Sequence, residues 1–197
     1  APGLNIHRNP LCGRNFEYFS EDPVISAATS VALIDGVQSH PGRGATIKHM
    51  VANNQETFRT AHNSIVSERA MREIYLRGFE LIIRHCEPYA VMTSLNCING
   101  LHGANNPDIG LRVVKDEWQY RGMVMTDWNT TTPERGGSTV GCVNAGNDLI
   151  MPGSTADIER LLQALRNKSG QGDSITLGAL QRSAAHVLRY IMKTERV

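Results

Sequence analysis

Short apolar runs that fit buried β-strands alternate with longer patterns that fit helices along this chain of 197 residues. Parallel strands must be joined by crossovers of a dozen or more residues, and a helix is the usual crossover. The alternation therefore restricts the chain to the α/β class, with a parallel sheet and helices outside it. The predicted strands are 45–47, 90–92, 123–125 and 149–151, with part of a fifth at 4–6.

The helices between these strands have recognisable starts and stops. Ser20 is expected to cap a helix that continues to about Gln38. The strongest helical pattern begins at Ser67 and is stopped by Pro88, with apolar residues on one face and charged residues on a solvated face. Further helices are predicted at 109–118, in a small-residue segment ending at 146, at 157–168 and at 176–194.

Composition excludes several classes of partner. Twenty basic residues stand against 19 acidic ones, so neither a nucleic acid nor an anionic membrane is expected as a partner. No apolar run approaches the roughly 18 residues of a membrane span. The four cysteines and seven histidines lack the spacing of metal ligands, so we expect no metal and no cofactor. The scattered cysteines favour a reducing compartment such as the cytoplasm, but leave the location open.

Polar or charged side chains follow the carboxyl ends of three predicted strands. Because the carboxyl ends of parallel strands meet at one edge, these side chains are expected to converge there. The clearest case is the run 122–128, in which an apolar strand ends at a carboxylate beside an indole. The groups concerned are Lys48, His49, Thr93, Ser94, Asn96, Asp127 and Trp128.

These groups suit sugar chemistry. A carboxylate at Asp127 can attack an electrophilic carbon or stabilise a developing cation, although an aspartate here can also be a helix N-cap. Trp128 offers a flat apolar face for a pyranose ring. Lys48 can hold a hydroxyl and help to keep nearby carboxylates deprotonated. His49 is a neutral donor for a second hydroxyl, or else a buried histidine with its hydrogen bonds satisfied.

Two arginines extend the candidate site. Arg14 offers a planar fork for two hydroxyls or a carboxylate. Arg59 follows the polar run 53–57, whose amides and carboxylate suit a sugar. The alternative for this run is an ordinary solvated surface.

Taken in chain order, these motifs resemble glycoside hydrolase family 3, in particular its β-glucosidase-like branch. The likeness is collinear over nearly the whole chain. It is carried by Gly13–Pro23, Ile47–Met50, Asn53–Glu56, Val66–Tyr75, Val91–Ser94, Asn99–Gly100, Asp116–Trp118, Gly122–Trp128 and Ala145–Gly153.

The resemblance implies a retaining exo-glycosidase that removes a terminal, non-reducing β-linked sugar from a glycoside or oligosaccharide. It assigns Asp127 as the nucleophile. The resemblance places Arg14, Lys48, His49 and Arg59 in the sugar subsite, with Trp128 stacking near the sugar.

Two departures from the family pattern matter. Leu95 stands where the family usually has a tyrosine that contacts the nucleophile. In the β-glucosidase-like branch the acid/base glutamate lies on a separate sandwich domain, which nothing in this chain resembles. No glutamate here is therefore assigned as the acid/base. The Asp-His dyad of other branches is not transferred to His62, because the sequence after Lys48 and His49 differs from theirs.

Four or five strands amount to about half of an eightfold (β/α)8 barrel of roughly 250 residues. Although an open sheet fits the pattern equally well, the resemblance favours a partial barrel formed by the last four to five β/α units. We expect residues 1–197 to form this partial domain, with no second domain in the chain. A companion chain or further segments would supply the acid/base, so the isolated chain is expected to be inactive.

Two other functional classes stay open. The chain could be a non-catalytic carbohydrate-binding or interaction fragment, which Leu95 and the missing domain favour. A Schiff-base aldolase using Lys48 is a third alternative, resting on generic residues.

Overall fold

The computed structural model describes residues 2–167 and 173–194. It confirms the α/β class, with a parallel sheet in the order β1 (Thr46–Met50), β3 (Ala90–Thr93) and β6 (Met123–Met125). The two outer predicted strands are reduced to single parallel bridges, one joining Gly3 to Lys48 and one joining Met125 to Leu149. All five strand positions thus follow one another in chain order, which is the arrangement of a partial barrel.

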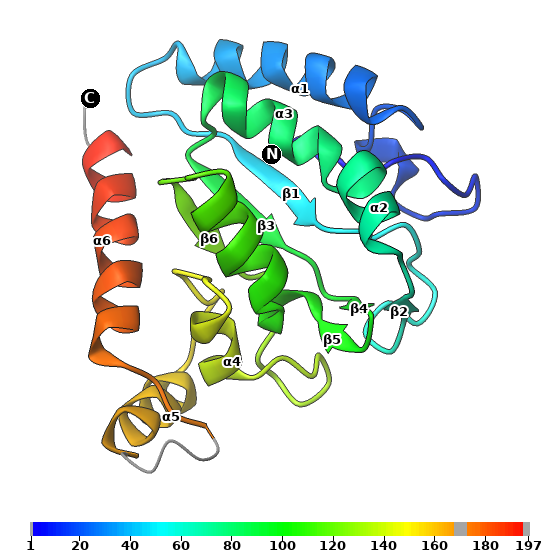
Figure 1. Cartoon of the computed structure of the whole chain (residues 1–197). Coiled ribbons are helices and arrows are strands. Elements are labelled where there is room, and N and C mark those ends of the chain that lie inside the picture. Colours follow the sequence, from blue (N-terminus) through cyan, green and yellow to red (C-terminus); the bar gives the residue numbers. More distant parts are fainter. Residues whose placement is uncertain (1, 168–172, 195–197) are drawn as a thin grey trace.

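Helices cover the outside of this strand layer (Figure 1). Helices α1 (Pro23–Gln38) and α3 (Arg77–Cys86) pack side by side over β1, and α6 (Leu177–Thr194) runs along the side of β6. Three further helices are the π-helical η4 (Asp108–Glu117), α4 (Thr139–Asn144) and α5 (Thr155–Arg166).

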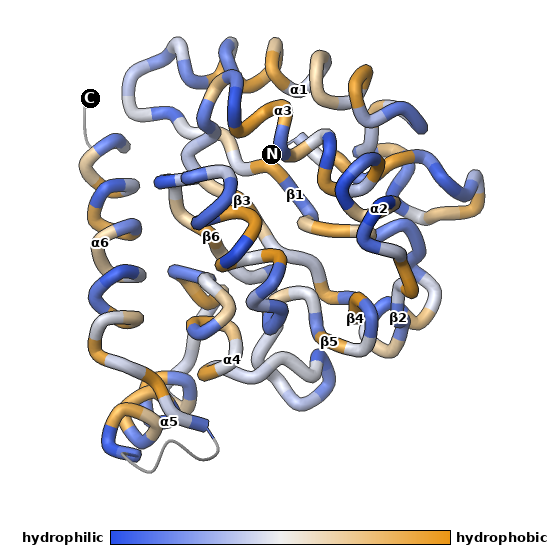
Figure 2. Tube along the Cα trace, in the orientation of Figure 1, coloured by the Kyte–Doolittle hydropathy of each residue, from blue (hydrophilic) through white to orange (hydrophobic). Residues whose placement is uncertain are grey.

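The core lies between the strands and the α1–α3 pair. Ile47, Val91 and Val124 in the three strands are completely buried, as are Ile34 in α1 and Phe79 in α3. All three residues of β6 are buried, which explains why this strand reads as an uninterrupted apolar run. Figure 2 shows hydrophobic stretches in these strands, in the middle of the molecule, with a hydrophilic interruption in β1.

The predicted N-cap of the first helix is wrong by two residues. Asp22 is the cap, because its Oδ1 accepts from the backbone N–H groups of Val24 (2.6 Å) and Ile25 (3.3 Å). Pro23 then occupies the first helical position, which its fixed φ suits. Ser20 accepts instead from the Asp22 N–H at 3.0 Å.

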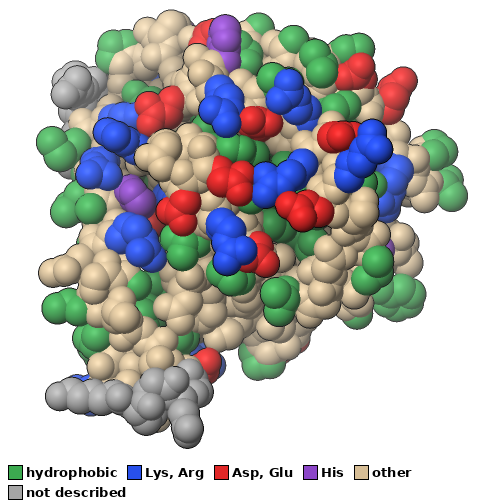
Figure 3. All heavy atoms as spheres, in the orientation of Figure 1, with side chains coloured by type: hydrophobic (Ala, Val, Ile, Leu, Met, Phe, Trp, Pro, Cys, Tyr) green, Lys and Arg blue, Asp and Glu red, His purple; other side chains and the backbone are tan. Residues whose placement is uncertain are grey.

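The helix predicted from Ser67 is confirmed but divided. Ser67 Oγ accepts from Ala70 N at 3.2 Å, and three segments follow: α2 (Glu68–Ala70), the π-helical η2 (Met71–Tyr75) and α3. The charged residues lie on the outer surface, as expected, where Figure 3 shows acidic and basic side chains intermingled. They form the ion pairs Arg69–Glu73, Arg72–Glu68, Arg72–Glu117 and Arg84–Glu80.

The remaining helices follow their predicted ranges within a few residues, except that residues 168–172 lie outside the described part of the chain. The sequence did not predict a second, three-stranded sheet after β1. The additional elements are β2 (Asn63–Ser64), β4 (Cys97–Ile98), β5 (Leu101–His102), and the 3₁₀ turns η1 (Asn15–Glu17) and η3 (Gly103–Asn105).

A buried ionic cluster joins η4, β6 and α6. Lys115 Nζ lies 2.8 Å from Asp148 Oδ2, and His186 Nδ1 lies 2.9 Å from Asp148 Oδ1. The same Asp148 Oδ2 accepts from Val124 N at 2.8 Å, and the aspartate side chain is fully buried. Burial lowers the pKa of Lys115, and the carboxylate of Asp148 opposes this shift. The cluster fixes the strand whose end carries Asp127.

The cysteines behave as small apolar residues. All four are free, and Cys12 and Cys142 are buried. Among the described residues, no helix has the length and apolar character needed to cross a membrane.

Candidate active site

Asp127 lies at the carboxyl end of β6 with its side chain partly open to solvent (16% exposed). Its Oδ1 accepts from Trp128 N at 2.6 Å, and its backbone carbonyl accepts from Thr130 Oγ1 at 2.8 Å. The N-cap alternative for Asp127 is wrong, because the next helix, α4, is capped by Ser138. The Oδ2 atom lies toward His49 of β1.

One member of the predicted pair from the first strand, His49, lies near this carboxylate. Lys48 and His49 lie within β1, whereas the sequence placed them just after it. His49 is almost fully buried, and its Nε2 lies 3.9 Å from Asp127 Oδ2. Burial lowers the pKa of His49 to about 3, and the charges of Arg14 and Lys48 add to this shift. The imidazole is thus neutral at neutral pH, as expected.

A carboxylate that the sequence analysis did not single out joins Arg14 to Lys48. Glu17 Oε2 accepts from Lys48 Nζ at 2.9 Å, and Glu17 Oε1 accepts from Arg14 Nε. Burial alone would raise the pKa of Glu17, but the hydrogen bonds from Lys48 and Arg14 outweigh this effect and lower it. The signal for Glu17 was its place in the segment 13–23, three residues after Arg14.

Arg59 is held in a similar way by Glu56, with 2.9 Å between Nη1 and Oε2. The loop around Glu56 lies next to the loop of Arg14. A Cβ atom added to Gly13 would be 3.5 Å from Glu56 Cγ, which is an ordinary van der Waals distance. Both arginines therefore belong to adjacent loops. The structure gives no direct contact between either arginine and Asp127.

The asparagines before Arg59 do not form the solvated surface considered as an alternative. Asn53 and Asn54 are 3% and 1% exposed. Asn53 Nδ2 donates to Tyr18 Oη at 3.3 Å and Asn54 Nδ2 donates to the Ile6 carbonyl at 2.6 Å. Their amides hold the loop together, and this use explains the polar run without a sugar.

The polar groups at the end of β3 and just after it are also structural. Thr93 Oγ1 donates to Asn147 Oδ1 at 3.0 Å. Ser94 Oγ donates to the Val51 carbonyl at 3.2 Å, and Asn96 Nδ2 donates to the same carbonyl at 3.4 Å. These side chains are buried and secure the backbone that follows β1. Among the strand-end groups predicted from the sequence, Lys48, His49, Asp127 and Trp128 therefore remain the candidates to face a ligand.

Exposed aromatic side chains stand beside the charged groups. Trp128, next to Asp127, is 57% exposed, so its ring is available for stacking. Phe16 and Phe58, which the sequence analysis did not name, are 85% and 80% exposed and directly adjoin Glu17 and Arg59 in the chain.

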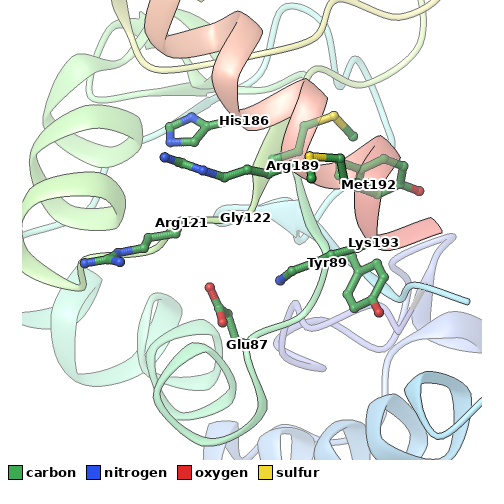
Figure 4. Close-up of a pocket in the computed structure, with 10 residues that line it drawn as sticks. Glu87, Tyr89, Arg121, Gly122, His186, Arg189, Met192 and Lys193 are labelled. Carbon is green, nitrogen blue, oxygen red and sulfur yellow. The ribbon is translucent and has the colours of Figure 1, made fainter. Parts of the chain in front are cut away.

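The cavity in Figure 4 is separate from these residues. It has a volume of about 350 Å³ and lies at the amino ends of β3 and β6, where Tyr89 and Gly122 line it with residues of α6. Functional groups of barrel proteins collect at the opposite, carboxyl ends of the strands. No cluster of three or more potential metal-ligating side chains occurs within residues 2–167 and 173–194.

Known proteins share both the sequence and the fold. Residues 1–190 match the glycosyl hydrolase family 3 N terminal domain. A β-glucosidase from Ruminococcus albus is 40% identical over 201 residues, covering 98% of this chain and 21% of that enzyme. An exo-alpha-(1->6)-L-arabinopyranosidase from Bifidobacterium longum is 42% identical over 194 residues, covering 98% of this chain and 24% of that protein.

A solved structure agrees with these matches. Beta-glucosidase 3B from Thermotoga neapolitana, in complex with glycerol, superposes with a TM-score of 0.89 at 43% identity. The superposition covers 98% of this chain and 27% of that one. The chain thus spans about a quarter of the length of such relatives. On the match of its sequence and of its partial barrel, the chain belongs to glycosyl hydrolase family 3.

Proposed function

We propose that this chain carries the nucleophile half of the active site of a retaining, exo-acting β-glycosidase of the β-glucosidase type. The observation that carries the proposal is the position of the Asp127 carboxylate, at the end of β6 and 3.9 Å from the neutral imidazole of His49. The relatives named above are glycoside hydrolases, which supports the reaction class. The proposed substrate is a terminal, non-reducing β-linked sugar.

In the proposed reaction, Asp127 Oδ2 attacks the anomeric carbon and displaces the aglycone, so that a covalent glycosyl-enzyme forms. Water then attacks the anomeric carbon and cleaves this ester bond. Each of the two steps inverts the configuration at that carbon, so the product retains the configuration of the substrate. The Asp127 Oδ1 atom is held by Trp128 N–H, which orients the carboxylate while leaving Oδ2 available. Lys48, His49, Arg14 and Arg59 would hold sugar hydroxyls, and Trp128 would stack on the ring.

The second carboxyl group must come from outside these residues. Glu17 is engaged by Arg14 and Lys48, and Glu56 is engaged by Arg59. The hydrogen bonds from Lys48 and Arg14 lower the pKa of Glu17, and Glu56 is bound to Arg59, so neither glutamate is assigned as the acid/base. General acid catalysis typically contributes about 10²–10⁴-fold, and this chain alone should lack that contribution. A companion segment or chain would supply it.

The second candidate is a carbohydrate-binding or interaction fragment without catalysis. Leu95 favours it, because a buried aliphatic side chain stands where the family resemblance implies a tyrosine hydroxyl near the nucleophile. The two candidates differ in one respect, namely whether a covalent bond forms at Asp127.

A single-turnover experiment separates them. The chain is incubated with 2,4-dinitrophenyl 2-deoxy-2-fluoro-β-glucoside, whose leaving group departs without general acid assistance. A nucleophile predicts stoichiometric release of dinitrophenolate by the wild type and by the exposed control variant Asp116→Asn, with none from Asp127→Asn. Sugar binding without release from the wild type, measured in the presence of the complementary half of the protein, would instead support the binding fragment.

A further inference from the structure

A buried hydrogen-bonded chain lies behind His49, on the side away from Asp127. Tyr18 Oη is 3.4 Å from His49 Nδ1, and the two rings meet edge to face with centroids 6.5 Å apart. Tyr18 is only 4% exposed, and burial raises the pKa of its hydroxyl, which is therefore protonated. A neutral imidazole carries one proton, so the contacts of its two nitrogens decide where that proton sits.

Two asparagine amides already donate to the tyrosine oxygen. Asn5 Nδ2 lies 3.2 Å and Asn53 Nδ2 lies 3.3 Å from Tyr18 Oη. The orientation of Asn5 is fixed because its Oδ1 accepts from Asn53 N at 3.0 Å while its Nδ2 also donates to the His49 carbonyl. The orientation of Asn53 is fixed because its Nδ2 also donates to the carboxylate of Glu56.

These two donors occupy the acceptor capacity of the tyrosine oxygen. A proton on His49 Nδ1 would be a third donor aimed at the same oxygen. It would also turn the lone pair of Nε2 toward the negative Asp127 Oδ2, 3.9 Å away. Both contacts improve when Nδ1 is the acceptor and Nε2 carries the proton.

We propose that Tyr18 is a positioning residue for His49: its hydroxyl donates to Nδ1, so that Nε2–H is presented to the space beside Asp127. The 3.9 Å between Nε2 and Oδ2 exceeds a direct hydrogen bond but lets both atoms contact one sugar hydroxyl. The tautomer is inferred from contacts within the chain alone. The inference that its Nε2–H binds a sugar hydroxyl rests on the proposed function. The sequence offers no direct sign of this role, since Tyr18 is the neighbour of Glu17 and reads as an ordinary aromatic residue.

Nitrogen NMR of the histidine rings tests the tautomer without any activity measurement. In the ¹⁵N-labelled chain at neutral pH, the signals of His49 are those lost in His49→Gln. We expect a protonated Nε2 and an unprotonated, hydrogen-bonded Nδ1. In Tyr18→Phe the Nδ1 resonance should shift toward that of an imidazole nitrogen without a hydrogen bond, while the matched control Tyr75→Phe, which removes a hydroxyl bonded to Arg8, should leave it unchanged.

Two results would overturn the proposal. One is a proton on Nδ1 of His49 in the wild type. The other is an Nδ1 resonance unaffected by Tyr18→Phe, which would mean that the hydroxyl donates to the Asn53 carbonyl, 3.3 Å away.

The rate at which the fluoro-sugar labels the protein covalently, called trapping below, adds a readout that general destabilisation would not reproduce. Because the net contribution of a single hydrogen bond is modest, Tyr18→Phe and His49→Gln should each lower the second-order rate constant for covalent labelling by about tenfold or less. If Tyr18 acts through His49, the double variant should be no slower than His49→Gln alone. Additive losses would contradict the proposal. Trapping that persists in Asp127→Asn would instead contradict the proposed function and leave the NMR result unaffected.

Discussion

The carboxylate of Glu17 accepts a hydrogen bond from Lys48 Nζ at 2.9 Å and so ties the loop that carries Arg14 to the edge of β1. Two cations that the sequence assigned separately to sugar binding are thus held by one anion. In an unliganded site, such an anion reduces the repulsion between the cations and limits the freedom of their long side chains. The arrangement makes the orientation of Lys48 and Arg14 dependent on Glu17.

Replacement of Glu17 by glutamine should therefore weaken sugar binding more than it slows the chemical step. We expect the apparent dissociation constant of the fluoro-sugar, measured from the concentration dependence of trapping, to rise by about tenfold, the equivalent of roughly 1.4 kcal/mol. The exposed Glu21→Gln is the matched control and should match the wild type. An unchanged dissociation constant in Glu17→Gln would refute this role.

The buried imidazole of His49 should make folding stability depend on pH. Its pKa falls from 6.5 to about 3 on folding, so between these values the unfolded chain binds more protons than the folded chain. Stability should therefore fall as the pH falls through this window, by about 1.4 kcal/mol per pH unit from this residue. Urea unfolding across the window should show a shallower pH dependence in His49→Gln; parallel curves for the two proteins would contradict the expectation.

Asp148 should be critical for stability because it is the only acidic member of the Lys115–Asp148–His186 cluster. Asp148→Asn would leave Lys115 buried without its counter-ion, and breaking such a pair costs about 3–5 kcal/mol. Urea denaturation should show this loss, whereas Asp116→Asn on the surface should change stability by less than about 0.5 kcal/mol. A wild-type unfolding curve for Asp148→Asn would show that the cluster does not hold β6 in place.

Apolar surface beside the last strand position should make the chain self-associate. A hollow of about 690 Å³ between α5 and α6 is lined by Leu149, Ile158 and Leu161 among others, and Leu188 and Met192 are 59% and 65% exposed. Leu149 joins the sheet through a single bridge, so its strand edge is open to pairing. Sedimentation should show association that increases with concentration and is reduced by Leu188→Glu. A monomer at every concentration would be the opposite result.

The sequence predicted those parts of the fold that depend on local pattern. The strands at 90–92 and 123–125 were predicted correctly, because a strand that is buried on both faces has a continuous apolar sequence. The cap of α1 was misplaced because Ser20 and Asp22 are both good caps, and only the position of Pro23 as first helical residue decides between them. The π-helical turns in η2 and η4 have no recognised local signal and were missed.

From the sequence, we could predict only the part of the candidate site that lies at the ends of strands. Asp127 and His49 were expected to meet because parallel strands open on one edge, and the structure brings them together. Glu17 and Tyr18 were not assigned roles, since their contacts arise when the loop after residue 12 folds onto β1. Asn53 was misinterpreted for the related reason that polarity alone does not distinguish a ligand-facing amide from a buried structural one.

The most direct measurement is peptide mapping by tandem mass spectrometry of the chain after trapping with the fluoro-sugar. We expect a single fluoroglucosyl adduct on the peptide containing residues 122–128, with the fragment ions assigning it to Asp127. An adduct on Glu17 or Glu56, or on a residue far from β6, would contradict the assignment of Asp127 as the nucleophile.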